Sequence, residues 1–246
     1  MSIALNISEI LFAGIDMSES KRKKMVNEGS IRKITSKIYT PNMVDSLEDI
    51  VKRNVFRILG FLFPHAVISH RSAFELKPTE AGDIYLTYEY TKNVKLPGLK
   101  VHLMEGHGGG ERDMPFIENL YISSAERRTL ENLQASRSRG GVSKCLPREY
   151  IENYLEKHLQ VNGEKGLNDF RDKARECSLE LGMKEEFNTL NSIIGALLLT
   201  RPVSILTSSG AVARASGEPF DAERVKLFGV LFEALHNQPF ETIDEP

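Results

Sequence analysis

The N-terminal part of the chain changes from helical to strand-like spacing of its apolar residues. Apolar side chains over residues 6–13 recur three and four positions apart and predict a short amphipathic helix. A second helix is expected over residues 19–27, with Gly29 as the left-handed residue that follows it. Apolar residues on both sides of the polar stretch 35–37 predict a tight two-stranded hairpin, which Pro41 closes.

The middle of the chain mixes both periods, and the last third has helical spacing throughout. Residues 136–143, between them, have the composition of a linker. Helices are predicted over 46–63, 72–76, 125–134, 148–160, 165–181, 184–201 and 221–236. Strands are predicted over 66–68, 83–89, 98–104 and 116–123. The expected fold class is α+β, with a winged-helix-like element over 1–43, a small mixed α/β domain over 44–135, and a helical third over 136–246.

Composition excludes several classes of protein. The 246 residues carry a formal net charge of −2, so bulk charge does not make the chain a polyanion binder. Cys145 and Cys177 form no CxxC pair, and no zinc-type ligand spacing occurs. The N-terminus lacks a signal-peptide pattern, and the longest apolar run, around 193–199, is too short to cross a bilayer. We therefore expect a cytoplasmic protein without disulfide, membrane span, metal or cofactor.

Positive charge is concentrated in residues 18–37. This segment has seven basic and two acidic residues, so its formal charge is +5 while the rest of the chain carries −7. In a winged helix, a recognition helix enters the major groove of DNA and the hairpin after it follows the backbone. Basic side chains on both would neutralise phosphates, and Arg22 is the best candidate for a bidentate contact to guanine. The residues expected to bind DNA are Ser20, Lys21, Arg22, Lys23, Lys24, Arg32, Lys33 and Lys37. The alternative is an ordinary solvated helix face.

The segment 11–41 resembles the winged-helix start of the AbiEi-type antitoxin family. That family has a glycine near the end of each helix and a triplet that ends its wing. Here these places are taken by Gly14, Gly29 and the Lys-Ile-Tyr triplet at 37–39. Residues 66–73 resemble the family's next strand, which is followed by a Ser-Ala helix start. Two helices precede the wing here, where a full winged helix normally has three. The wing turn has Ser-Lys where the family usually has a basic residue and glycine.

The whole chain also resembles the region ahead of the catalytic domain in a group of Fic-type AMP-transferases. The catalytic motif of those enzymes, His-x-Phe-x-Asp/Glu-Gly-Asn-Gly-Arg, does not occur in the sequence. This resemblance therefore implies a regulatory module without the active site.

The glycine-rich stretch 105–113 is the strongest candidate for chemistry outside the basic segment. Its glycines could present backbone NH groups to a phosphate, with His107 and Arg112 assisting. The stretch lacks the Lys-Ser/Thr of a P-loop, and a flexible loop between strands needs only the conformational freedom of glycine. We favour the loop.

Three histidines, His65, His70 and His102, could in principle hold a metal or activate a serine. Ser72 lacks the Gly-x-Ser-x-Gly elbow that presents a serine nucleophile, so we do not expect it to be catalytic. We expect that the protein is not an enzyme. The sequence predicts a non-catalytic DNA-binding antitoxin or transcriptional autoregulator of a toxin–antitoxin or phage-defence operon. Its expected partners are double-stranded DNA, a toxin or Fic-type protein, and a second copy in a homodimer. The alternative is a regulatory protein-interaction module of a Fic-type AMP-transferase.

Overall fold

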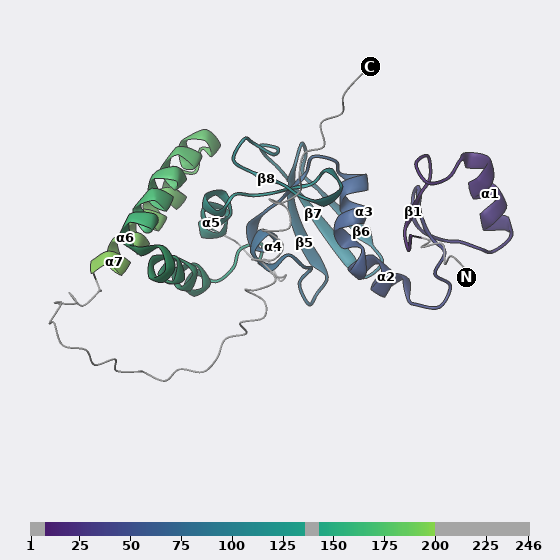
Figure 1. The fold of residues 1–246 in the computed structure, drawn as a ribbon, viewed down its shortest axis with the longest axis horizontal. Coiled ribbons are helices and arrows are strands. Elements are labelled where there is room, and N and C mark those ends of the chain that lie inside the picture. Colours follow the sequence, from purple (N-terminus) through teal and green to yellow (C-terminus); the bar gives the residue numbers. More distant parts are fainter. Residues whose placement is uncertain (1–7, 136–142, 200–246) are drawn as a thin grey trace, which may run out of the picture. The chain divides into compact units, whose positions relative to one another are not determined.

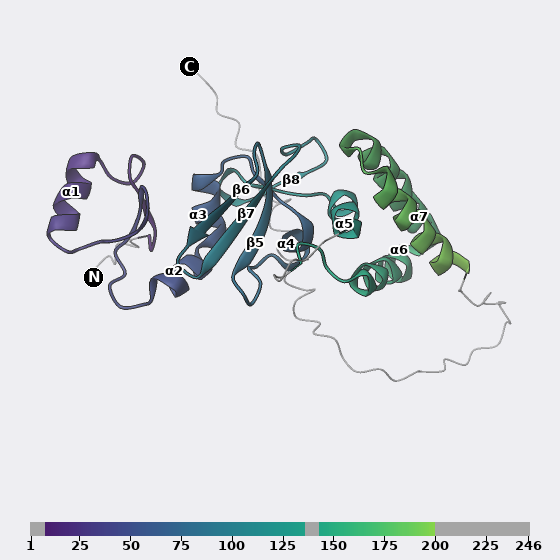
Figure 2. The same cartoon turned by 180° about the vertical axis from the view of Figure 1, so that it is seen from behind.

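The computed structural model describes residues 8–135 and 143–199 (Figure 1, Figure 2). The helix expected over 221–236, nearly all of the linker expected over 136–143 and the end of the helix expected over 184–201 lie outside the described residues. No helix in the described ranges is both long enough and apolar enough to cross a membrane.

The N-terminal part folds into one helix and a three-stranded antiparallel sheet. Its elements are β1 (Leu11–Phe12), α1 (Glu19–Asn27), β2 (Arg32–Thr35) and β3 (Ile38–Thr40), in the strand order β1-β3-β2. The helix over 19–27 and the hairpin after it are confirmed. α1 begins where the Ser18 hydroxyl accepts a hydrogen bond from the backbone NH of Lys21, and Gly29 follows its end with a φ of +67°.

The helix expected over residues 6–13 is wrong, because Leu11–Phe12 form strand β1. Leu11 pairs with Tyr39 and Phe12 with Ile38, so β3 satisfies the backbone groups of this segment. Ile10 and Phe12 are both buried, which is the alternation of a strand on a half-buried sheet. In so short a segment, spacing alone does not separate a helix from a strand.

The middle domain contains a six-stranded mixed sheet in the order β6-β7-β5-β4-β9-β8. Its central strands β5 and β7 pair in parallel, as do β4 and β9, and the other neighbours are antiparallel. The strands expected over 66–68, 83–89 and 98–104 are confirmed. The bounds are β4 (Val67–Ile68), β5 (Asp83–Tyr88), β6 (Lys92–Leu96), β7 (Leu99–Glu105), β8 (Met114–Pro115) and β9 (Tyr121–Ile122).

Parts of this sheet differ from the expectation, among them β8, which lies outside the predicted strands. β6 is an edge strand whose lysines are exposed, so it lacks the spacing of a half-buried strand and forms only by pairing with β7. The strand expected over 116–123 is wrong over its first half, which is the short 3-10 helix η1 (Ile117–Asn119). Glu118 and Asn119 there have positive φ, which a continuous strand does not allow.

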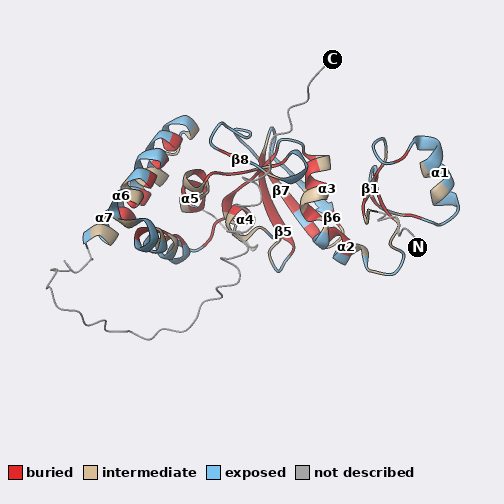
Figure 3. Cartoon of the chain, viewed as in Figure 1, coloured by how far each residue is buried: buried red, intermediate tan, exposed pale blue. Residues whose placement is uncertain are grey.

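The middle domain has four α-helices in the described residues, of which the first three contribute side chains to the core of the sheet. They are α2 (Leu47–Arg53), α3 (Val55–Leu62), α4 (His70–Glu75) and α5 (Ala125–Leu133). A single helix was expected over 46–63, but Asn54 interrupts it with a φ of −110° and a ψ of 21°. Buried side chains of α2, α3 and the sheet form one apolar core with Ile10, Phe12, Ile34 and Ile38 of the N-terminal part. In Figure 3 the central strand β5 is coloured mainly as buried, whereas α1 is coloured as exposed or intermediate.

The last described part is helical, as expected. It consists of α6 (Arg148–Leu181) and α7 (Lys184–Leu199), which pack against each other and, with α5, enclose a second apolar core. α6 is interrupted at Gly163, whose φ of 69° and ψ of −175° are not helical. The two helices expected over 148–160 and 165–181 therefore correspond to the two halves of α6. The α+β fold class with a helical C-terminal region is confirmed.

Candidate nucleic-acid interface

Helix α1 lies on the N-terminal sheet with almost all of its surface in solvent. None of its residues is buried. Its apolar contact comes from Met25, which packs, partly buried, against a small cluster of Met17, Ile31 and Tyr39. A helix with so little buried surface gains little from packing, so polar contacts must help to hold it in place.

Arg22 supplies those polar contacts. Its Nε donates to the carboxylate of Glu19 at 2.9 Å, its Nη2 donates to the same carboxylate, and its Nη1 donates to the Tyr39 hydroxyl at 2.9 Å. These bonds to Glu19 and Tyr39 raise the pKa of the guanidinium, which also lies 5.7 Å from the centroid of the Tyr39 ring. The fork that could read guanine is thus occupied, and Arg22 fixes α1 to β3.

Arg32, the other arginine of the basic segment, is also engaged within the protein. Its guanidinium donates to the backbone carbonyls of Asn42, at 2.6 and 3.0 Å, and of Asp45, at 2.6 Å. It therefore holds the loop after β3 against β2. Neither arginine presents a free guanidinium to a ligand in this arrangement.

The lysines of the segment are arranged differently. Lys21, Lys23, Lys33 and Lys37 are exposed, and none of them makes an ion pair within the described residues. Lys24 lies 3.8 Å from Glu28 in a loose contact between two exposed side chains. Ser20 is exposed, with its hydroxyl 3.1 Å from that of Ser18. The free positive charge of the segment is therefore carried by lysines on α1, on β2 and at the hairpin turn.

The turn between β2 and β3 holds one of these lysines in an unusual conformation. Lys37 has a φ of +62°, in the left-handed region that favours glycine. Its carbonyl accepts a hydrogen bond of 2.8 Å from the backbone NH of Ala13, so the segment after β1 fixes the turn. The hairpin tip thus presents a lysine whose backbone is in a strained conformation.

A polar network joins the N-terminal part to α2. Arg53 Nη2 donates to the carboxylates of Glu9 and Asp45, both at 2.6 Å, and Asn54 donates to Glu9 at 2.6 Å. The Arg53 bond is the largest cause that lowers the pKa of Glu9 to about 2. Apolar contact accompanies the network, because the Phe12 ring stacks on Phe61 with centroids 4.2 Å apart. The N-terminal part, which carries the candidate nucleic-acid interface, therefore shares its apolar core with the middle domain.

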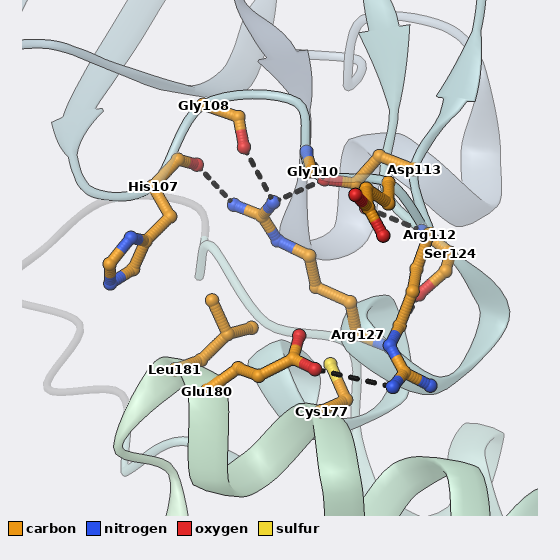
Figure 4. Close-up of a pocket in the computed structure, with 11 residues that line it drawn as sticks. His107, Gly108, Gly110, Arg112, Asp113, Ser124, Arg127, Cys177, Glu180 and Leu181 are labelled. Atoms are coloured by element: carbon orange, nitrogen blue, oxygen red, sulfur yellow. Dashed lines mark hydrogen bonds and ion pairs between the residues drawn. The ribbon is translucent and has the colours of Figure 1, made fainter.

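The glycine-rich loop over 105–113 surrounds a buried arginine (Figure 4). Arg127, from α5, donates to the carbonyls of His107 and Gly108 at 2.8 and 3.3 Å and also to the carboxylate of Asp113. On its other side Arg127 Nε donates to Glu131 at 2.8 Å. Burial lowers the pKa of Arg127, but the two carboxylates outweigh it and the net shift is upward.

The cavity beside this loop, of about 320 Å³, is a poor match for a phosphate. Arg112 is bound to Glu176 at 2.9 Å and to Glu180 at 3.2 Å, both on α6. Burial raises the pKa of Cys177, which also lines the cavity, to about 12, so its thiol is not activated. Every arginine of the lining is paired with carboxylates, and the geometry gives the loop a structural role.

The three histidines singled out in the sequence have separate structural partners. His65 lies beside the ring of Tyr121, and His102 Nε2 lies 2.6 Å from the carboxylate of Asp83. The ring nitrogens of His70 lie 3.2 Å from the Ser69 hydroxyl and 3.2 Å from the Gln134 side-chain oxygen. The Ser72 hydroxyl accepts from a backbone NH of β5. No group of three or more potential metal ligands occurs among the described residues.

Sequence reasoning missed the residues that hold the interface together. Tyr39 and Glu19 engage Arg22, and Glu9 and Arg53 join the element to α2. The Glu19–Arg22 spacing of three positions is a recognisable helical pair, whereas nothing in the sequence links Glu9 to Arg53. No protein-family model, curated protein or solved structure matches the chain. The resemblances to AbiEi-type antitoxins and to Fic-type proteins therefore stay predictions.

Proposed function

We propose that the chain is a DNA-binding antitoxin or transcriptional autoregulator that binds operator DNA through α1 and the β2–β3 hairpin. One observation carries this proposal. The arginines of the basic segment make hydrogen bonds within the protein, whereas its lysines are exposed to solvent on α1 and on the adjacent hairpin. Along the chain, α1 follows β1 and precedes β2, and in the sheet the strand order is β1-β3-β2. This arrangement suits a recognition helix followed by a wing.

Lysine suits the contact that this surface would make. Its ammonium group is a point charge on a flexible stem, which reaches phosphates without a fixed geometry. About 4–6 such contacts would release as many counterions, and binding would weaken steeply with salt at a slope of about −0.9 per contact. The net charge of the chain is negative, so a local basic surface, rather than bulk attraction, must bring DNA to α1.

The test is an electrophoretic shift with the full chain and DNA from upstream of its own gene, at two salt concentrations. The double substitution Lys21→Glu with Lys24→Glu should abolish binding, because it replaces two phosphate contacts on α1 by repulsion. Lys92→Glu with Lys95→Glu, on the exposed edge strand β6, is the matched control with the same change in net charge. The proposal fails if the wild-type chain does not bind at low salt, or if both double variants lose the same affinity.

A further inference from the structure

The outward face of α1 carries a short stripe of side chains opposite its sheet contacts. Arg22 and Met25 face the sheet, one through Tyr39 and the other through the small apolar cluster. Residues three and four positions apart share one helix face. The stripe that this spacing places on the far side consists of Ser20, Lys23, Lys24 and Asn27, all of which are exposed.

The chemistry of the stripe differs from one member to the next. The two lysines carry donors only, and the Ser20 hydroxyl is already beside that of Ser18. The amide of Asn27 carries both a donor and an acceptor, and it makes no hydrogen bond within the described residues. An Asn side chain in the major groove pairs with adenine by accepting from N6 and donating to N7. Asn27 is the member of the stripe whose amide can make the bidentate pair with adenine, whereas the lysines can only donate, to phosphates or to guanine O6 and N7.

Asn27 has no structural task that would explain it. An asparagine at a helix end often serves the cap, but here backbone groups close the helix. The NH of Glu28 donates to the carbonyl of Lys24, and the NH of Ser30 donates to that of Met25, both at 2.9 Å. Asparagine is also a weaker helix former than alanine. Asn27 therefore makes α1 less stable than alanine would, and no contact within the described residues compensates for this loss.

From this geometry we infer that Asn27 is the base-reading residue of α1 and recognises an adenine in the major groove. The inference rests on the proposed function. Lys23 and Lys24, on the same face, bind the phosphates that flank that base, and Arg22 is a positioning residue that orients the helix on β3. Sequence preference then comes from one amide, whereas affinity comes from the lysines.

The experiment is a selection of bound duplexes from a randomised library, with the full wild-type chain and with Asn27→Ala. The wild-type chain should enrich a motif that contains an adenine, and Asn27→Ala should lose the preference at that position by about tenfold or more. Asn27→Ala should keep the salt slope of the wild-type chain and a melting temperature at least as high, because no internal contact is lost. Asn188→Ala, an exposed asparagine on α7, is the matched control and should keep the motif.

The possible failures can be told apart. If the wild-type chain retains no duplex even at low salt, the proposed function itself fails. If it binds DNA but enriches no motif, or if Asn27→Ala enriches the same motif as the wild-type chain, the role of Asn27 is refuted while DNA binding stands. A loss of all DNA binding in Asn27→Ala, with unchanged melting, would make Asn27 a determinant of affinity and would also refute the inference.

Discussion

Replacing Lys37 by glycine distinguishes two effects of this residue at the tip of the β2–β3 hairpin. Its charge should affect DNA binding, and its backbone conformation should affect stability. A residue with a side chain in the left-handed region costs about 1–2 kcal/mol. Lys37 sits there with a φ of +62°. Glycine removes that strain but loses more backbone entropy on folding, which costs about 0.5–1 kcal/mol. The free energy of unfolding should therefore stay the same or rise by up to about 1.5 kcal/mol.

The effect of the same substitution on DNA binding should have the opposite sign. Lys37 is exposed and makes no ion pair within the described residues, so its ammonium is free to contact a phosphate. Its loss should make the slope of log affinity against log salt less steep by about 0.9. Lys37→Gly should thus bind DNA more weakly although the fold is as stable as before or more so. A strained residue retained at a binding surface is expected to behave in this way.

Two assays on three proteins decide the matter. Urea denaturation measures stability, and fluorescence anisotropy at several salt concentrations measures the slope, for the wild-type chain, Lys37→Gly and Lys37→Ala. Alanine removes the charge but keeps a side chain in the strained conformation, so it should lose the contact without gaining stability. The reasoning on strain is refuted if Lys37→Gly is less stable than Lys37→Ala. The reasoning on the wing is refuted if both variants keep the wild-type slope.

Two further predictions concern the polar network around Glu9 and the glycine-rich loop over 105–113. The folded-state pKa of Glu9 is lowered from 4.5 to about 2, so its stabilisation is present above pH 4.5 and is lost as the pH falls towards 2. The difference in urea midpoint between the wild-type chain and Glu9→Gln should therefore shrink over that interval, and a constant difference would contradict the network. A Cβ at Gly109 would lie 2.5 Å from the ring of Tyr121, whereas one at Gly110 would meet nothing within 4 Å. Gly109→Ala should lower the free energy of unfolding by about 1–3 kcal/mol and Gly110→Ala should not, and equal effects would exclude close packing of this loop.

Much of the fold follows from local sequence, because the relevant signals lie within a few positions of one another. A capping serine and a following glycine predict helix α1, and turn residues predict the hairpin after it. The break in the helical spacing between 160 and 165 predicts the interruption of α6, which the structure places at Gly163. Strand β1 and edge strand β6 are not readable in this way. β1 is defined by its pairing with β3, which lies more than twenty positions further along the chain. β6 pairs with β7 across a two-residue turn, but its largely exposed side chains lack the alternation of a half-buried strand.

For the proposed interface, the sequence by itself determined where positive charge is concentrated and which local elements carry it. Only the tertiary structure decided which of those charges are free. Arg22 reads as the best base contact until Tyr39, seventeen positions away, is seen to occupy its guanidinium. The sequence does not single out Arg127, but in the fold Asp113 and two loop carbonyls surround its guanidinium. The physical reason is the same for both: the partner of a side chain is set by the distance between atoms in the fold, and separation along the chain does not encode that distance.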